Sequence, residues 1–268
     1  MKKQTVIITG ASGNLGQQLQ KHSPYELVLV DRNNWNELSK TPFNSVRAII
    51  HSAYDLKKDL NTDPAEVLDS NIVSTGRSLK LCKDAGIEQF VFISSCSVYG
   101  DSSNTSEEKA KTPITMNGFT KAYNEELVMS FCKANNINYL ILRPFNSYGG
   151  NDTFSVVQKL IFCAQNNQVF NLANGGIAER DFIHVEDVAK MTYMLMEKNL
   201  SNAIVNVGSG ESVRILDLVK AIEAKFGMIK VNKINKPDEA IYSRANLKKL
   251  RELIDYEPMS IFDFIQKL

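Results

Sequence analysis

The sequence predicts an α/β protein, with a doubly wound parallel sheet of the Rossmann type and a smaller, partly interleaved C-terminal substrate domain. In the first half, short β-branched or apolar runs alternate with longer helical patterns, and a glycine turn follows the first run directly. Continuous apolar strands that alternate with helices are typical of a parallel sheet covered on both faces. After residue 150 the segments become shorter and more irregular, which predicts the second domain.

Five apolar runs are expected to form the strands of the sheet. They are TVIIT (5–9), LVLV (27–30), AIIH (48–51), FVFIS (90–94) and YLILR (139–143). Helical patterns begin between them near Leu15, Ala65 and Gly118. Right-handed crossovers through these helices would bring the carboxyl ends of the strands to one edge, where such sheets bind their ligands.

The domain boundary is predicted near residue 150. Residues 1–150 are expected to form the dinucleotide-binding domain, and residues 151–268 the smaller substrate-binding domain. Helical patterns return at 185–198 and 212–227. The segment from about 184 to 207 is expected to pack back on the first domain.

The composition is ordinary for a soluble globular protein. Lys and Arg total 31 against 30 for Asp and Glu, so the net charge of +1 gives no electrostatic reason to expect nucleic acid or a membrane. No apolar stretch approaches the ~18 residues of a membrane helix, and the N-terminal run TVII predicts a strand, not a signal peptide. The four cysteines have no metal-binding spacing, which predicts free thiols, no metal site and a cytoplasmic protein.

The glycine turn is the first motif with a chemical role. VIITGASGNLG places Gly10, Gly13 and Gly16 directly after a strand and into a helix. Glycines let the backbone approach a pyrophosphate, and the helix N-terminus offers unpaired N–H groups and the positive end of its dipole. The spacing is G-x-x-G-x-x-G, not G-x-G-x-x-G, and a tight structural turn is the alternative explanation. The preceding strand favours a dinucleotide site.

An acidic residue at the end of the second strand indicates which dinucleotide is bound. Asp31 ends LVLVD, about 20 residues beyond the turn, where a carboxylate can accept both ribose hydroxyls. A carboxylate there repels a 2′-phosphate, so NAD is favoured over NADP. Arg32 could stack on adenine or meet a phosphate, which keeps NADP as the alternative.

Seven segments, in this order, resemble the extended short-chain dehydrogenases/reductases, the NAD-dependent epimerase/dehydratase family that remodels nucleotide sugars. They are TGASGNLG, IIHSAY (49–54), DPAEVLDSNIVST (63–75), FVFISSCSVYG (90–100), LILRPFNSYGG (140–150), RDFIHVEDVA (180–189) and VNVGSGESV (205–213). The resemblance covers nearly the whole chain. It implies NAD as cofactor and a nucleotide sugar as substrate.

The resemblance also implies roles for individual residues. Ser95 would hydrogen-bond the reacting sugar oxygen, and Lys121 would bind the nicotinamide ribose and lower the pKa of a tyrosine. Asn146 and Arg180 would face the diphosphate of the nucleotide sugar, and Ser95 would touch the same substrate. Each role has a structural alternative. Ser95 could be a strand-end hydroxyl bonded to backbone, and Lys121 a solvated helix lysine. Arg180 could form an ion pair with an adjacent acid. The implied cofactor-binding set is Gly10, Ser12, Gly13, Asn14, Leu15, Gly16, Asp31, Arg32, Ser52, Ala53, Asn71, Lys121 and Pro144.

One position departs from the family pattern. The family has a tyrosine four residues before the lysine, in a frame like Y-G-x-S-K, and here the frame reads N-G-F-T-K from Asn117 to Lys121. Residues four apart share a helix face, so the geometry is kept while the chemistry changes. A tyrosine can give or take the sugar proton, whereas an asparagine amide hydrogen-bonds but does not titrate. The catalytic set is therefore Ser95, Lys121 and Asn117, with altered proton transfer.

Other residues could supply the missing acid. Tyr123 lies about 200° round the helix from Lys121 and is expected to face away. Tyr99 and Tyr148 are expected on loops at the rim of the crevice and are better placed. Cys96 carries a thiol that can act as an acid or base. SSCSVYG lacks the acidic pair of the family's dehydratases, which favours an epimerase or a ketosugar reductase.

Three hypotheses remain open from the sequence. The first is an NAD(P)-dependent nucleotide-sugar epimerase or ketosugar reductase with an altered proton-transfer residue. The second is a cofactor-binding regulatory or partner subunit that has lost catalysis. The third is that Asn117 is an engineered or clone-specific change in an ordinary enzyme.

A homodimer is also expected, because the family pairs the helix near Ala65 and the helix of Lys121 across two subunits. The apolar positions that would then need cover, or would be ordinary core, are Val67, Ile72, Leu79, Leu127, Val128 and Phe131.

Overall fold

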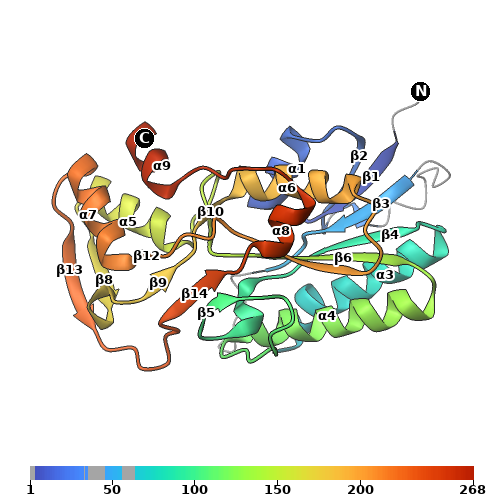
Figure 1. The fold of residues 1–268 in the computed structure, drawn as a ribbon, viewed down its shortest axis with the longest axis horizontal. Coiled ribbons are helices and arrows are strands. Elements are labelled where there is room, and N and C mark those ends of the chain that lie inside the picture. Colours follow the sequence, from blue (N-terminus) through green and yellow to red (C-terminus); the bar gives the residue numbers. More distant parts are fainter. Residues whose placement is uncertain (1–3, 33, 36–45, 56–63) are drawn as a thin grey trace.

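A six-stranded parallel sheet forms the core of one half of the molecule (Figure 1), in the order β11-β6-β4-β3-β1-β2. The computed structural model describes residues 4–32, 34–35, 46–55 and 64–268. The strands are β1 (Thr5–Thr9), β2 (Glu26–Val30), β3 (Val46–His51), β4 (Gln89–Ile93), β6 (Asn138–Pro144) and β11 (Ala203–Val207). The predicted fold class is confirmed, and the five predicted strands form with ends shifted by at most two residues.

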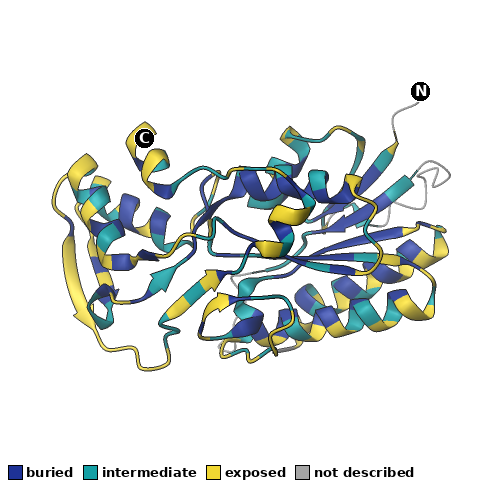
Figure 2. Cartoon of the chain, in the orientation of Figure 1, coloured by how far each residue is buried: buried dark blue, intermediate teal, exposed yellow. Residues whose placement is uncertain are grey.

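Helices cover both faces of the sheet (Figure 1). α1 (Asn14–Lys21) and α6 (Val185–Glu197) pack on one face, where Val6 and Ile8 point. α3 (Ser74–Asp84) and α4 (Met116–Ala134) cover the other, where Ile7 and Phe92 point. Successive strand residues face opposite sides, so continuous apolar runs suit a sheet buried twice. Figure 2 accordingly shows the central strands buried.

α3 is preceded by α2 (Pro64–Leu68) and a π-helical turn, η3 (Asp69–Val73). Asp63, a residue type that often caps helices, precedes this segment and lies outside the described residues. Gly86 follows α3 with φ of +65°. Such a conformation suits glycine, which has no Cβ to clash.

The second half of the chain has its own core. α5 (Val156–Gln165), α7 (Ile215–Phe226) and α9 (Ile261–Lys267) pack on β8 (Val169–Ala173), which pairs with β13 (Lys230–Ile234). Between α5 and α7 the chain returns to the main sheet through α6 and β11, and β11 pairs with β6. α8 (Lys248–Leu253) lies against β11. A boundary at residue 150 remains a prediction.

Two small sheets join the halves. One has the order β12-β9-β14-β5, formed by Val213–Arg214, Glu179–Arg180, Tyr242–Ala245 and Ser102–Thr105. The other pairs β7 (Ser147–Tyr148) with β10 (Ile183–His184). A short 3-10 helix, η4 (Cys96–Tyr99), follows β4. No helix of the described residues is long and apolar enough to cross a membrane.

A buried carboxylate holds the first small sheet together. Asp181 is fully buried, and its oxygens accept from Ser209 N and Oγ at 2.8 Å each, Gly210 N at 2.9 Å and Ala245 N at 3.1 Å. Burial raises the pKa of Asp181, and these hydrogen bonds oppose the rise. A buried carboxyl group needs such partners, so Asp181 fixes the strand that carries Arg180.

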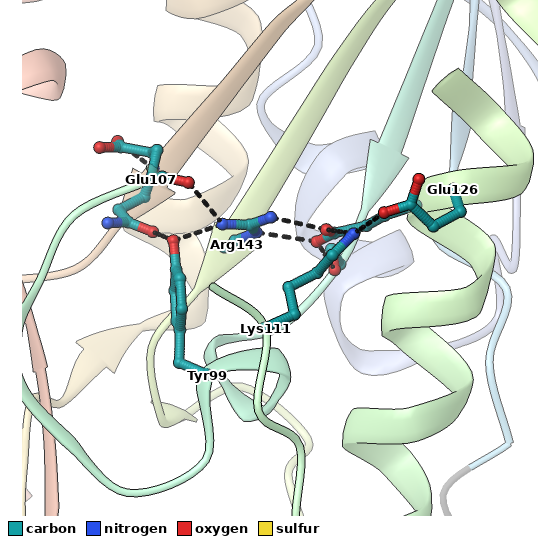
Figure 3. A network of polar contacts seen from close by, with 8 residues as sticks. Tyr99, Glu107, Lys111, Glu126 and Arg143 are labelled. Carbon is teal, nitrogen blue, oxygen red and sulfur yellow. Dashed lines mark hydrogen bonds and ion pairs between the residues drawn. The ribbon is translucent and has the colours of Figure 1, made fainter. Parts of the chain in front are cut away.

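A buried ion pair joins α4 to β6 (Figure 3). Arg143 donates from Nε to Glu125 Oε1 at 2.8 Å and from Nη2 to Oε2 at 2.6 Å. The Arg143 side chain is 2% exposed and that of Glu125 is fully buried. Arg143 Nη1 donates to Tyr99 Oη at 2.5 Å and to the Glu107 carbonyl at 3.3 Å. Tyr99 in turn donates to Asn206 Oδ1 at 2.8 Å, so the network reaches β11.

We expect Glu125→Gln to lower the free energy of unfolding by about 3–5 kcal/mol, because it leaves the Arg143 cation buried without its countercharge. Urea denaturation measures the change. The control is Glu126→Gln, whose side chain is 61% exposed and which should stay within about 1 kcal/mol of wild type. Glu125→Leu combined with Arg143→Met should lose less stability than the two single variants summed. Equal losses in the two glutamine variants would contradict a structural role for the pair.

Candidate active site

The glycine turn packs tightly and leaves a helix N-terminus open. Gly10 has φ of +75°, and a Cβ there would lie 2.5 Å from Ala53 N. A Cβ on Gly16 would lie 2.2 Å from the Gly10 carbonyl. Gly13 is the N-cap of α1, and no side chain caps this helix. Uncapped first-turn N–H groups are a ready site for an anion, so the turn fits the pyrophosphate of a dinucleotide.

The other predicted turn residues differ in their environments. Asn14 donates to the Gly149 carbonyl at 2.9 Å and accepts from Asn151 N at 2.8 Å. It therefore ties the turn to the segment after β7. Ser12 is exposed, and Leu15 packs on the core beneath the turn.

The end of β2 carries the predicted ribose site. Asp31 is half-buried and exchanges hydrogen bonds with Asn34, which holds its carboxylate at the strand end. Arg32 forms an ion pair with Asp55 at 2.6 Å. This pairing engages the arginine that could have met a 2′-phosphate, which favours NAD over NADP.

The loop after β3 lies beside the turn and is fixed by polar contacts. Ser52 Oγ donates to the Thr9 carbonyl at 2.8 Å, and Ala53 lies under the turn. The buried Asn71 accepts from Asp55 N at 2.7 Å and donates to the Asp55 carbonyl at 3.3 Å. Pro144 ends β6 at the same edge of the sheet. The structure thus brings these predicted cofactor residues to the carboxyl ends of the strands.

A hydroxyl chain connects Asn117 to Ser95. Asn117 Nδ2 donates to Ser97 Oγ at 3.0 Å, and Ser97 Oγ donates to Ser95 Oγ at 2.9 Å. Ser97 N also donates to Ser95 Oγ, at 3.1 Å. A Cβ on Gly118 would lie 2.4 Å from the Ser97 carbonyl, so this glycine lets α4 approach η4 closely. The N-cap of α4, Thr115, fixes the first turn by accepting from Gly118 N.

This arrangement assigns donor and acceptor roles. Ser95 Oγ accepts two hydrogen bonds, which leaves its own proton to donate outward. Asn117 Oδ1 is buried and has no hydrogen-bond partner among the described residues. The sequence prediction gave Ser97 no role in the site. Its position two residues after a strand-end serine was the available signal, because such hydroxyls bond back to local groups.

Lys121 is not a solvated helix lysine. It is 5% exposed, and Nζ donates to the Ile93 carbonyl at 2.7 Å. Nζ also lies 4.3 Å from the ring centroid of Tyr54 and 5.0 Å from that of Phe92. Burial lowers the pKa of Lys121 to about 7, although Glu125 acts to raise it.

The expected substitutes for the missing tyrosine are not poised for proton transfer. Tyr123 is 55% exposed and faces away, as predicted. The expectation that Tyr99 and Tyr148 line the rim is wrong, because both are buried. Tyr99 is held in the Arg143 network, and burial raises its pKa to about 12. Burial also raises the pKa of the Cys96 thiol.

A cleft of about 380 Å³ is lined mainly by residues of the second half of the chain. Its lining includes Asn146, Lys159, Phe170, Arg180, Lys236 and Glu239. Asn146 donates to the Asp181 carbonyl at 2.8 Å and to Ser243 Oγ at 3.2 Å, and Ser243 contacts Cys96 of η4 at 3.7 Å. The cleft therefore adjoins the segment that carries Ser95.

Arg180 has a different partner from the one considered in the sequence. The predicted alternative was an ion pair with an adjacent acid, but Arg180 Nη2 meets Glu239 at 3.5 Å. The Arg180 guanidinium also donates to the carbonyls of Ala240 at 2.6 Å and Ile241 at 3.1 Å. Within the described part of the chain, no group of His, Cys, Asp and Glu is arranged to hold a metal ion.

The parallel sheet, the uncapped glycine turn and the Ser95–Lys121 arrangement define a dinucleotide-binding fold of the short-chain dehydrogenase/reductase class. The model of the NAD dependent epimerase/dehydratase family matches residues 6–208, and the chain belongs to this family.

Individual relatives cover most of the chain. The chain is 28% identical, over 83% of its length and 75% of the relative's, to an ADP-L-glycero-D-manno-heptose-6-epimerase of Brachyspira hyodysenteriae. It is 27% identical, over 74% of its length and 64% of the relative's, to a Streptomyces dTDP-4-dehydro-6-deoxy-D-allose reductase. The structure of MoeE5 in complex with UDP-glucuronic acid and NAD superposes with a TM-score of 0.89 at 23% identity, covering 98% of this chain and 96% of that one.

We expect Lys121→Met to stabilise the protein, on the order of 3 kcal/mol at pH 6, because it removes a buried cation. Folding lowers the pKa of Lys121 from 10.5 to about 7. Between these values the unfolded chain holds a proton that the folded chain has released, so the stability of the wild type rises with pH. The advantage of the methionine variant should therefore be largest below pH 7 and shrink towards pH 10. Denaturation across this range measures it.

The matched control is Lys133→Met, on an exposed position of the same helix, which should show no such trend. A constant difference between Lys121→Met and wild type from pH 6 to pH 10 would contradict the lowered pKa.

Proposed function

We propose that this protein is an NAD-dependent nucleotide-sugar epimerase or ketosugar reductase, an isomerase or oxidoreductase, in which Asn117 replaces the proton-transferring tyrosine. The observation that carries the proposal is the hydroxyl chain from Asn117 through Ser97 to Ser95. It leaves Ser95 as an outward donor, which suits a sugar oxygen that gains negative charge as a carbonyl is reduced. The family and the relatives that act on nucleotide sugars support the same class.

The remaining residues fit the roles of binding and orientation. Bound NAD would supply or remove a hydride at the sugar carbon. Gly10, Gly13 and Gly16 would hold its pyrophosphate, Asp31 its adenine ribose and Lys121 its nicotinamide ribose. The diphosphate of the nucleotide sugar would lie in the 380 Å³ cleft, where cationic side chains gather.

A second candidate function is a cofactor-binding regulatory or partner subunit. Asn117 favours it, because an amide cannot hold the transferred proton. Calorimetry that shows NAD binding, together with no hydride transfer to any sugar, would support this alternative. A wild-type turnover rate above the solvent background would exclude it.

We also propose a homodimer built on α4 and the helical segment 64–84. Val67, Leu79 and Val128, which were considered for the interface, are buried within the chain, and Leu127 and Phe131 pack on the same core. The apolar residues left exposed are Leu68, Val73, Phe119 and Tyr123. Phe119 and Tyr123 are four apart and share one face of α4, which a second copy would cover.

The proposed activity is tested with NAD and NADH and a panel of UDP-, dTDP-, GDP- and CDP-sugars and their keto forms. On a sugar that turns over, Ser95→Ala should lower kcat about 10²–10³-fold while NAD affinity is kept. The control is Ser103→Ala, at an exposed position on β5. No turnover on the whole panel, with none gained in Asn117→Tyr, would contradict the proposed function.

The proposed dimer is tested by light scattering at micromolar concentration. We expect twice the chain mass of 30.0 kDa, and the single-chain mass for Phe119→Glu. The control is Phe162→Glu on α5, since Phe162 and Phe119 are each 55% exposed. A wild-type mass of one chain would overturn the proposal.

A further inference from the structure

The turn of α4 that carries Asn117 and Lys121 has a phenol beside it, supplied by another element. Tyr54 lies on the loop after β3, and its ring centroid is 4.3 Å from Lys121 Nζ. The Thr120 hydroxyl lies close enough to the Tyr54 phenol to lower its pKa. The aromatic ring and the lysine are therefore in contact, although 67 residues separate them in the chain.

The Thr120 contact places the phenol relative to Asn117. Thr120 is three residues after Asn117, and residues three apart are neighbours on a helix surface. Thr120 Oγ1 donates to the Met116 carbonyl at 2.6 Å, and the Thr120 hydroxyl lies beside the Tyr54 phenol. The phenol of Tyr54 is thus held within one turn of the position where the family has its tyrosine.

The loop that carries Tyr54 is held firmly enough to position it. On one side, Ser52 Oγ is bonded to the Thr9 carbonyl of β1. On the other, both backbone groups of Asp55 are bonded to the buried amide of Asn71. Asn71 is fixed in turn, because Asn124 of α4 donates to its carbonyl at 2.6 Å. The loop is therefore tied to β1 on one side of Tyr54 and, through Asn71, to α4 on the other.

We propose that Tyr54 is the catalytic acid–base residue of this protein, in place of the tyrosine absent at position 117. The inference rests on the proposed function. In the reductive direction, bound NADH would supply a hydride to the sugar carbon as the C=O π bond breaks. The O–H bond of Tyr54 then breaks, its proton forms an O–H bond on the sugar oxygen, and the electron pair stays on the phenolate beside Lys121. The oxidative direction reverses each step.

The charges around Tyr54 explain why NAD binding should change the pKa of Tyr54. Without a cofactor, burial raises the pKa of Tyr54, the Thr120 hydroxyl opposes the rise, and Asp55 adds to it. Asp55 is paired with Arg32, and His51 at the end of β3 stays neutral because burial lowers its pKa to about 3. Lys121 is then the adjacent cation while it keeps its proton, below its own pKa of about 7. The positive nicotinamide of NAD would add a second one and favour the phenolate.

A spectroscopic titration tests the assignment without turnover. The absorbance of tyrosine phenolate is followed from pH 6 to pH 11, with and without NAD. We expect NAD to lower the pKa of one tyrosine by at least about 1. The shift should vanish in Tyr54→Phe and persist in Tyr123→Phe, which changes an exposed tyrosine of the neighbouring helix. A shift that persists in Tyr54→Phe, or no shift in the wild type, would overturn the assignment.

A kinetic test applies on any sugar that the wild type turns over. Tyr54→Phe should lower kcat by about 10²–10⁴-fold and remove one limb of the pH–rate profile, with KM for NAD and melting temperature kept. In the Tyr54→Phe background, Asn117→Tyr should recover at least a tenth of the loss in log kcat. Asn117→Gln in the same background should recover none. An unchanged kcat in Tyr54→Phe overturns the role of Tyr54 and leaves the proposed function standing. If the wild type turns over nothing, the proposed function fails. The titration then decides whether NAD lowers the pKa of Tyr54.

Discussion

The bidentate contact between Glu125 and Arg143 is the constraint on which the candidate site depends. It fixes the rotation of α4 against β6, because two parallel hydrogen bonds in a buried place allow little turning. Ser94, the residue before Ser95, donates to the same carboxylate at 2.6 Å. The Glu125 carboxylate therefore positions both the end of β4 and the helix that carries Lys121. A small error in its position would separate Ser95 from Lys121.

The same constraint explains the state of Lys121. Glu125 lies one turn further along α4, where a lysine could expect its countercharge. Its oxygens are already engaged by Arg143, by Ser94 and by Lys111 at 3.5 Å. What remains for Lys121 is a backbone carbonyl and two aromatic faces, which stabilise a cation less than a carboxylate does. Burial then prevails, and the pKa of Lys121 falls towards neutrality.

The parts that the sequence predicted are those specified by local pattern. Apolar runs fixed five strands, and the glycine turn needed only its own backbone and the preceding strand. The failures are polar contacts between distant segments. Tyr99 and Tyr148 follow strands in sequence and were expected at the surface, yet β11 and the second core bury them. Tyr54 was overlooked, since its contact with Lys121 depends on how α4 packs on the sheet.

These contacts define what Asn117 can and cannot do in the site. A tyrosine in that frame would have two tasks, to hydrogen-bond the reacting centre and to hold a proton. An amide can perform only the first, and here it does so through Ser97, whose hydroxyl is turned onto Ser95. The second task requires a titratable group close to a cation. Lys121 keeps its position without a tyrosine four residues before it, so it can bind the nicotinamide ribose and still lie beside a phenol. The Tyr54 ring is that neighbour, and in our proposal it performs the second task.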